Sequence, residues 1–270
     1  MYTRLNRRSL LVATLIASTA FFTRVADATI VEFQTVMGNF EVNLYDNATP
    51  ETVANFLDYL NNGAYTRAVY HRSVTGFVLQ GGGFSFDMAL PLNSIPANPA
   101  VVNEPEFSNV RGTIAMAKLA GNPNSATNQW FFNLADNSAN LDDQNGGFTA
   151  FGEVVGNGMD VVDAIAALPT FNFGSPIEEL PLQNYTANDF NNNVPVDSTH
   201  LIIIDAVIIS DSTVDSAAGL NPPVNPAANA PPPPPPTPTS GGGGGGGSFG
   251  FFGLLALVLG YRIRRRHSMG

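Results

Sequence analysis

Apolar and polar residues alternate along much of the chain, and this alternation predicts β-strands. Residues 29–45 (TIVEFQTVMGNFEVNLY) alternate on either side of Gly38-Asn39, which predicts a hairpin of two half-buried strands. Phe77 to Gln80 predict a short strand that ends at three glycines. Further strands are expected at 112–117 (GTIAMA), 128–134 (NQWFFNL), 148–155 (FTAFGEVV) and 201–210 (LIIIDAVIIS), the last buried for most of its length.

Two segments have a helical period instead. Residues 49–63 begin with a capping threonine, a proline and an acid, and end at Gly63, with an apolar face formed by Val53, Phe56, Leu57 and Leu60. The second apolar face, which stops near Pro169, consists of Met159, Val162, Ile165 and Ala166. Residues 85–105 and 171–198 have no clear period and predict loops, the second a long surface excursion. Many strands with two helices and little βαβ rhythm predict a mainly β protein, a closed β-barrel with helices over its ends.

The N-terminus, residues 1–28, is typical of a secretory signal peptide. Its positive region is followed by an apolar core at 10–16 and by the small-residue site Ala26-Asp27-Ala28 before Thr29. The alternative is a buried first helix of the fold. We therefore expect an exported protein whose folded domain spans 29–211.

The C-terminal part changes character twice. Residues 212–247 hold six consecutive prolines from Pro231 and seven glycines from Gly241, which predicts a disordered linker. Residues 248–270 contain an apolar run followed by Arg264-Arg265-Arg266, which predicts a membrane-seeking helix with a positive cytoplasmic end. The apolar run is short for a membrane span. A helix docked on the domain is the alternative.

Charge and composition exclude several functions. Between the two ends the chain has four cations (Arg67, Arg72, Arg111 and Lys118) against 21 acids, a net charge of −17. Such a surface repels nucleic acid. The chain has no cysteine, and its three histidines lack the spacing of metal ligands. We expect neither a metal site nor a cofactor.

The stretch 70–84 (YHRSVTGFVLQGGGF) is the most distinctive of the chain. If Arg72 lies on a strand beside the one predicted for 77–80, its guanidinium shares a surface with the side chains of Phe77 and Gln80. A cation, an apolar wall and an amide would then form one shallow site. An ordinary hairpin with an exposed arginine is the alternative.

These motifs resemble the cyclophilin family of peptidyl-prolyl cis-trans isomerases. The resemblance extends over about residues 29–210 and rests on YHRSVTGFVLQGG, GTIAMA, NQWFFNLADN, the Leu141-Asp142 turn and FTAFGEVV. It implies an eight-stranded antiparallel barrel capped by two helices. It also implies isomerase (rotamase) activity, EC 5.2.1.8, on polypeptides that contain X-Pro bonds, with no cofactor.

The resemblance also implies roles for individual residues. Arg72 matches the catalytic arginine, with Phe77, Gln80 and Phe131 beside it as the other residues expected to act in catalysis; Phe131 forms the floor of the proline pocket. The expected substrate-binding positions are Val78, Ala117, Lys118, Gln129, Leu141 and Phe148. Lys118 stands where many relatives have Asn, and Phe148 where eukaryotic members have His. Asn140 replaces the usual Trp or Phe, which puts cyclosporin binding in doubt.

The tail resembles a second class of sequence, the bacterial C-terminal sorting signals with a Gly-rich stretch, an apolar helix and an Arg cluster (GlyGly-CTERM). That resemblance implies recognition by a rhomboid-like membrane protease. We thus expect a monomer in the periplasm, or anchored to the membrane or cell surface and released after cleavage; a plain tail anchor is the alternative. Two other functions stay open: a non-catalytic holdase that grips proline peptides, and a surface-display protein built around its Pro-rich stalk.

Overall fold

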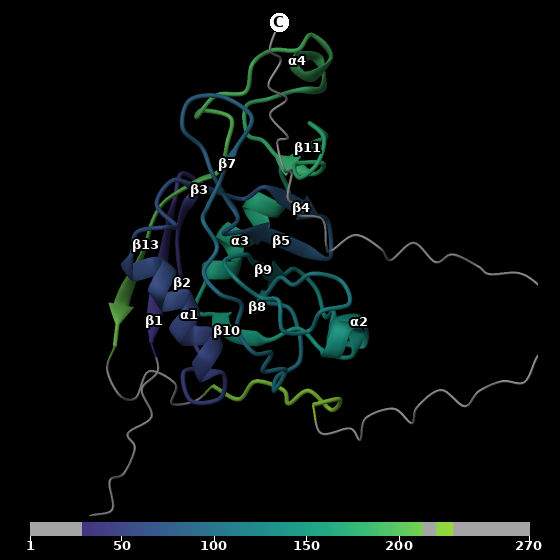
Figure 1. The fold of residues 1–270 in the computed structure, drawn as a ribbon. Coiled ribbons are helices and arrows are strands. Elements are labelled where there is room, and N and C mark those ends of the chain that lie inside the picture. Colours follow the sequence, from purple (N-terminus) through teal and green to yellow (C-terminus); the bar gives the residue numbers. More distant parts are fainter. Residues whose placement is uncertain (1–28, 213–219, 229–270) are drawn as a thin grey trace, which may run out of the picture.

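The computed structural model describes residues 29–212 and 220–228 (Figure 1). The predicted signal peptide and the apolar segment 248–270 lie outside these residues. Within the described ranges, no helix combines the length and the apolar character that a membrane span requires.

The described residues form a mainly β fold with a few helices. The strands are β1 (Ile30–Thr35), β2 (Gly38–Leu44), β3 (Ala68–Val69), β4 (Arg72–Val74), β5 (Val78–Gly81), β6 (Phe84–Ser85), β7 (Asn93–Ser94), β8 (Thr113–Met116), β9 (Trp130–Asn133), β10 (Ala150–Val154), β11 (Thr170–Phe171), β12 (Leu180–Pro181) and β13 (Ile203–Asp211). The helices are α1 (Pro50–Asn61), α2 (Ser138–Leu141), α3 (Gly158–Ala166) and α4 (Ala187–Asn191), with a 3₁₀ turn at Gln144–Gly146.

Eleven strands form one curled antiparallel sheet in the order β4-β5-β9-β8-β10-β2-β1-β13-β3-β6-β7. The predicted hairpin is β1 and β2, which pair from Ile30 opposite Asn43 to Thr35 opposite Gly38. The sheet has eleven strands, three of them only two residues long, where the resemblance implied eight. In the described part of the chain no pairing joins β4 to β7, so closure of the barrel stays a prediction.

The main core lies inside the curled sheet, where every second residue of each strand points. Phe33, Trp130 and Phe132 are fully buried there and meet edge to face. The predicted helices α1 and α3 pack against this core through Val53, Phe56, Val162 and Ile165, with Leu57 and Leu60 partly buried at its margin. The strand β13 differs from expectation. Ile208 and Ile209 are 40% and 41% exposed, because this end of the strand pairs only with β1.

The N-terminus of α1 is capped by a distant residue. Thr49 precedes the helix as predicted, but its hydroxyl donates to the carbonyl of Tyr45. Glu104 accepts instead from the backbone N–H of Glu51 at 3.2 Å and of Thr52 at 2.9 Å. A carboxylate there also suits the positive end of the helix dipole.

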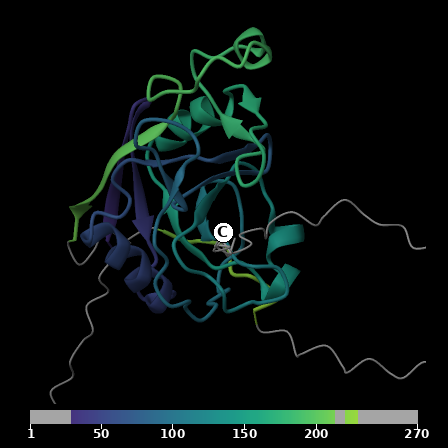
Figure 2. The same ribbon diagram turned by 45° about the horizontal axis from the view of Figure 1, so that its top comes forward.

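Residues 171–198, the expected surface excursion, have an apolar cluster of their own, which the absence of a period did not indicate. Their buried side chains, among them Phe171, Leu180 and Tyr185, form a second hydrophobic cluster that also includes Phe84 and Ile203 of the main sheet. Helix α4 has a capping box between Thr186 and Asp189. In Figures 1 and 2 this excursion forms one end of the molecule.

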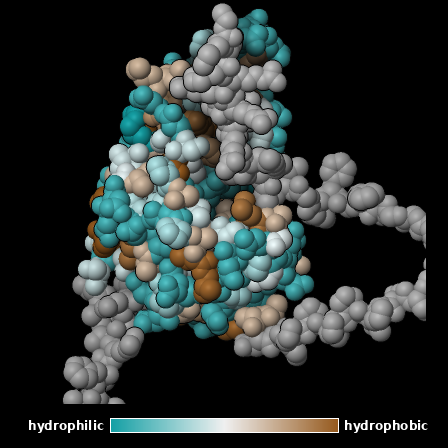
Figure 3. Space-filling model, in the orientation of Figure 1, coloured by the Kyte–Doolittle hydropathy of each residue, from teal (hydrophilic) through white to brown (hydrophobic). Residues whose placement is uncertain are grey.

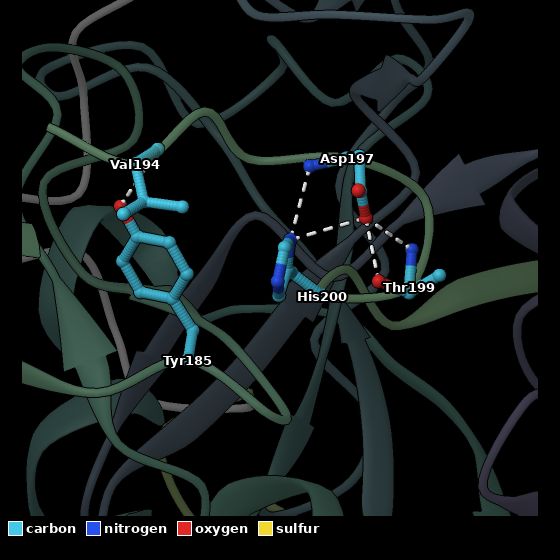
Figure 4. A network of polar contacts seen from close by, with 5 residues as sticks. All are labelled: Tyr185, Val194, Asp197, Thr199 and His200. Atoms are coloured by element: carbon cyan, nitrogen blue, oxygen red, sulfur yellow. Dashed lines mark hydrogen bonds and ion pairs between the residues drawn. The ribbon is translucent and has the colours of Figure 1, made fainter. Parts of the chain in front are cut away.

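Short polar contacts hold the outer part of the excursion (Figure 4). The Tyr185 hydroxyl donates to the carbonyl of Val194 at 2.7 Å. Asp197 accepts from both the backbone and the hydroxyl of Thr199, and its carboxylate lies 3.1 Å from Nδ1 of His200. Local hydrogen bonds of this kind carry no hydrophobic period, which is why the sequence pattern did not reveal the fold of this region.

Residues 220–228 form a strap against the domain, within the range 212–247 that the sequence assigns to a disordered linker. Val224 bridges to Phe107, and the carbonyl of Pro223 accepts from the backbone N–H of Ser108 at 2.8 Å. Asn225 is 1% exposed, and its Nδ2 donates to the carbonyl of Asp142 at 3.0 Å. Figures 1 and 2 show the strap at the end opposite the excursion. The domain therefore includes residues beyond 211.

His71 is buried between strands β3 and β4 in the neutral form. It is 2% exposed and meets Phe84 edge to face with ring centroids 4.9 Å apart. Burial, with the charge of Arg72 as the next cause, lowers the pKa of His71 from 6.5 to about 3. Below pH 6.5 the unfolded chain therefore binds a proton that the folded chain does not, so stability falls as the pH decreases from about 6.5 to about 3.

The contacts of the strap predict that Asn225→Ala lowers the stability of the domain. The substitution removes the donor to Asp142 and leaves that carbonyl buried without its partner, so we expect a loss of about 1–2 kcal/mol of unfolding free energy. This corresponds to a Tm lower by roughly 2–6 °C in a domain of this size. Asn221→Ala changes the same residue type at an exposed position of the strap and serves as the control. Equal Tm values for the two variants would show that the strap does not stabilise the domain.

The neutral His71 makes a second prediction. Between pH 7 and pH 5 we expect the wild type to lose about 2 kcal/mol of unfolding free energy more than His71→Gln, because only the unfolded wild type takes up this proton. Urea denaturation at the two pH values measures the difference. Parallel curves for the wild type and His71→Gln would contradict a neutral buried imidazole.

Candidate active site

Four neighbouring strands line up the predicted site residues. Arg72 on β4 lies opposite Gln80 on β5, Gln80 opposite Phe131 on β9, and Phe131 opposite Ala115 on β8. Residues directly opposite each other in antiparallel strands point to the same face of the sheet. The guanidinium, the amide and the aromatic ring therefore share one face, as the sequence predicted for Arg72 and Gln80.

Three of these strands, β5, β8 and β9, are buried on both faces. Leu79, Ile114 and Phe132 alternate with the site residues and point into the main core. On the opposite face, Val78, Ala115 and Phe131 join a small separate apolar cluster. Strand β9 has three apolar residues in succession, Trp130, Phe131 and Phe132, because each of its faces meets other side chains.

The small cluster is a buried aromatic cluster. Phe131 is fully buried, and its ring meets that of Phe148 at 69° with centroids 5.9 Å apart. Leu141, from α2, completes the buried part of the cluster. Phe77 is half-buried at the rim, and its carbonyl accepts from Nδ2 of Asn137 at 2.9 Å. The structure thus groups the five apolar positions that the sequence assigned to the proline groove, Phe77, Val78, Phe131, Leu141 and Phe148.

Gln80 and Gln129 form the polar side of the site. Nε2 of Gln80 donates to Oε1 of Gln129 at 2.8 Å. The three glycines after Gln80 permit this packing: a Cβ on Gly83 would come within 2.7 Å of the Gln129 side chain, and one on Gly81 within 2.6 Å of the Trp130 ring. The glycine run is therefore a site of close packing.

Arg72 is held at one end of its guanidinium. Its Nε lies 2.8 Å from Oε2 of Glu179, which comes from the excursion. Its Nη1 is buried and has no hydrogen-bond partner among the described residues. The sequence missed Glu179, because nothing in a region without a period indicates which of its acids reaches the site.

Lys118 has a different role from Arg72. The residue is 4% exposed. Its ammonium lies 4.7 Å from the centre of the Phe148 ring and donates to the carbonyls of Asn145 and Gly147 and to Oδ1 of Asn103. Burial lowers the pKa of Lys118 to about 8. This side chain fixes the loop that leads into Phe148, whereas the sequence assigned only the backbone of Ala117 and Lys118 to the groove.

A cleft of about 300 Å³ opens beside Arg72. Its walls include Arg72, Gln80, Ala117, Lys118 and Gln129 from the sheet side and Ser175, Pro176 and Glu178 from the excursion. The visible face in Figure 3 is mostly hydrophilic outside the grey atoms, with hydrophobic residues in small separate patches. No group of His, Cys, Asp and Glu side chains suited to a metal ion occurs in 29–212 and 220–228. The five positions assigned to the proline groove are not among the residues that line this cleft. The arrangement offers a charged hydrogen-bond donor at the cleft, with the buried aromatic cluster nearby on the same face of the sheet.

The sequence of this chain is similar to those of known proteins. The family model "Cyclophilin type peptidyl-prolyl cis-trans isomerase/CLD" matches residues 30–187. A peptidyl-prolyl cis-trans isomerase of Acinetobacter baylyi is 42% identical over 147 residues, which cover 54% of this chain and 76% of the relative.

Two further relatives have the same activity in their names. Peptidyl-prolyl cis-trans isomerase A of Dickeya dadantii is 42% identical over 176 residues, covering 63% of this chain and 88% of the relative. Peptidyl-prolyl cis-trans isomerase B of Escherichia coli is 37% identical over 168 residues, covering 59% of this chain and 100% of the relative. This chain belongs to the cyclophilin-type peptidyl-prolyl cis-trans isomerases.

Proposed function

We propose that this protein accelerates the cis-trans rotation of X-Pro bonds in exported proteins, with Arg72 as the residue that stabilises the twisted transition state. The observation that supports this role is the common face of Arg72, Gln80 and Phe131. Nη1 of Arg72 has no hydrogen-bond partner in the described part of the chain, so the fold itself does not use this donor.

The chemistry needs a positioned donor and no covalent step. Rotation about an amide has a barrier of roughly 18–20 kcal/mol because the nitrogen lone pair is delocalised. In the twisted state the prolyl nitrogen becomes pyramidal and can accept a hydrogen bond. A guanidinium keeps its charge at every relevant pH and donates from several N–H groups, so it stabilises that state more than the planar ground state.

The aromatic cluster would hold the proline ring. Phe131, Leu141 and Phe148 are buried together, and Phe131 lies on the same face of the sheet as Gln80 and Arg72. A ring seated there excludes water, which strengthens the interaction of Arg72 with the prolyl nitrogen. Phe77 at the rim and Val78 beneath it extend the apolar wall.

The polar side would hold the peptide backbone. The amide of Gln80, oriented by Gln129, can donate to a substrate carbonyl. The backbone at Ala117 and Lys118 borders the cleft and can pair with an extended peptide. These contacts fix the bond that rotates with respect to Arg72.

We also propose export as a monomer, followed by sorting through the tail. The supports are the signal-like composition of residues 1–28 and the sequence of glycines, apolar residues and arginines after Ser240. A rhomboid-like protease at the membrane is the proposed partner of the tail. Periplasmic or surface location would bring the enzyme to newly exported chains.

Arg72→Ala tests the catalytic role. We expect at least a hundredfold loss of the enzyme-catalysed exchange rate on an Ala-Pro peptide, measured by two-dimensional NMR exchange, because the charged donor is gone. Arg72→Lys should lose most of the rate as well, since an ammonium lacks the planar fork. Arg111→Ala is the matched control: Arg111 pairs with Asp163 at an exposed position outside the cleft, and its removal should leave the rate unchanged.

Two results would contradict this assignment. A wild-type rate in Arg72→Ala would remove Arg72 from the mechanism. Wild-type protein that binds the peptide and does not accelerate exchange would favour the holdase alternative.

Export and sorting predict two cleavages of the full chain. The protein is expressed in a bacterium that possesses the sorting protease, and the fraction outside the cytoplasm is recovered. We expect mass spectrometry of this protein to show a mature N-terminus at Thr29 and the loss of the apolar tail. A variant without Gly241–Gly247 should keep its tail and stay with the membrane fraction. Protein outside the cytoplasm that still begins at Met1 would contradict export by a cleaved signal peptide. A cleaved tail in the variant without the glycines would contradict their role in sorting.

A further inference from the structure

We propose that Glu179 is a positioning residue for Arg72: its carboxylate holds Nε of the guanidinium and keeps the remaining N–H groups directed at the substrate. The observation that carries the proposal is the 2.8 Å contact between Oε2 of Glu179 and Nε of Arg72. The inference rests on the catalytic role of Arg72 proposed above.

The fold fixes the backbone of Glu179 next to β4. The carbonyl of Glu179 accepts from the backbone N–H of Ser73 at 2.9 Å, one residue after Arg72. Leu180 follows at once, is fully buried, and packs with Val69 and Phe84 in the cluster that joins the excursion to the sheet. Ile177, two residues earlier, is also buried in this cluster. The carboxylate is therefore brought to Arg72 by packed structure on both sides of it.

Glu179 contacts the Nε atom of Arg72 and leaves the other N–H groups of the guanidinium free of this ion pair. Nε carries one of the five N–H groups of an arginine, so four remain on Nη1 and Nη2. Nη1 is buried without a partner in the described residues, and the cleft opens at Arg72. Glu179 consequently anchors the side chain and does not occupy the donors that a prolyl nitrogen would need.

The exposure of the pair points to orientation as its main effect. The side chains of Arg72 and Glu179 are 18% and 40% exposed, and ion pairs with this much contact to water add little to stability. A free arginine side chain samples many rotamers, and ordering it costs free energy at the moment it is needed. A donor ordered before the substrate arrives needs no reorganisation in the transition state.

The other charged groups at the cleft do not hold the guanidinium of Arg72. The ammonium of Lys118 is bound by carbonyl groups of the loop at 145–147, and His71 is neutral. Glu178 lines the cleft and makes no recorded ion pair. Among the described residues, Glu179 is the one carboxylate in an ion pair with Arg72.

The test is a double-mutant cycle on the full chain. We expect Glu179→Ala to lower the exchange rate of the bound Ala-Pro peptide roughly tenfold, with its Kd changed by less than about twofold, because the peptide-binding walls are intact. Glu179→Gln keeps an acceptor for Nε and should lose only roughly threefold. In the Arg72→Ala background, Glu179→Ala should cause no further loss, since a positioning residue has nothing left to position.

A spectroscopic signal and a control separate positioning from a general loss of structure. The Nε–Hε resonance of Arg72 should be sharp and slow to exchange in the wild type and should broaden in Glu179→Ala. Asp205→Asn, at an exposed carboxylate on β13, should change neither the rate nor this resonance.

The proposal fails if Glu179→Ala keeps or exceeds the wild-type rate, or if it lowers the rate equally in the Arg72→Ala background. A fully active Arg72→Ala would instead overturn the proposed mechanism, so the two failures are distinguishable.

Discussion

The register of four antiparallel strands is the constraint on which the site depends. Because β4, β5, β9 and β8 pair with Arg72, Gln80, Phe131 and Ala115 in one line, a cation, an amide and an aromatic ring point to the same face. A slip of one residue in any pair would turn the side chains of that strand to the other face. Leu79 and Phe132, which fill the main core, oppose such a slip because it would expose them.

Two segments outside the sheet stabilise the site from different sides. The excursion 171–198 has its own apolar cluster, packs on the sheet through Leu180, and supplies Glu179 to Arg72. The strap 220–228 buries Asn225 against the carbonyl of Asp142, next to Leu141 of the aromatic cluster. The excursion thus supports Arg72, and the strap supports the aromatic cluster; both segments follow the site residues in the sequence.

Much of the fold could be predicted from the sequence, because its strands and helices have strong periods. The hairpin of β1 and β2, the helices α1 and α3, and the strands β5, β8, β9 and β10 all occur where alternation or a helical face placed them. The groove positions followed from a resemblance of motifs, and the structure groups Phe131, Leu141 and Phe148 in one cluster.

The rest could not be read from the sequence because long-range contacts decide it. Asn225 lies in a Pro-rich stretch that is typical of linkers, and its burial depends on a carbonyl of the distant Asp142. Glu104 caps α1 across a long loop, and Glu179 reaches Arg72 from a region without hydrophobic period. The exposure of Ile209 on β13 reflects the lack of a second neighbour at that end of the strand. An apolar composition alone does not indicate that missing neighbour.

A crystal structure of the domain with an Ala-Pro peptide tests the central claim most directly. The account predicts the proline ring against Phe131, with an Nη atom of Arg72 within about 3.2 Å of the prolyl nitrogen or of a water bound to it. A peptide bound on another face of the sheet, or a guanidinium turned away from the prolyl nitrogen while the ring lies against Phe131, would contradict it.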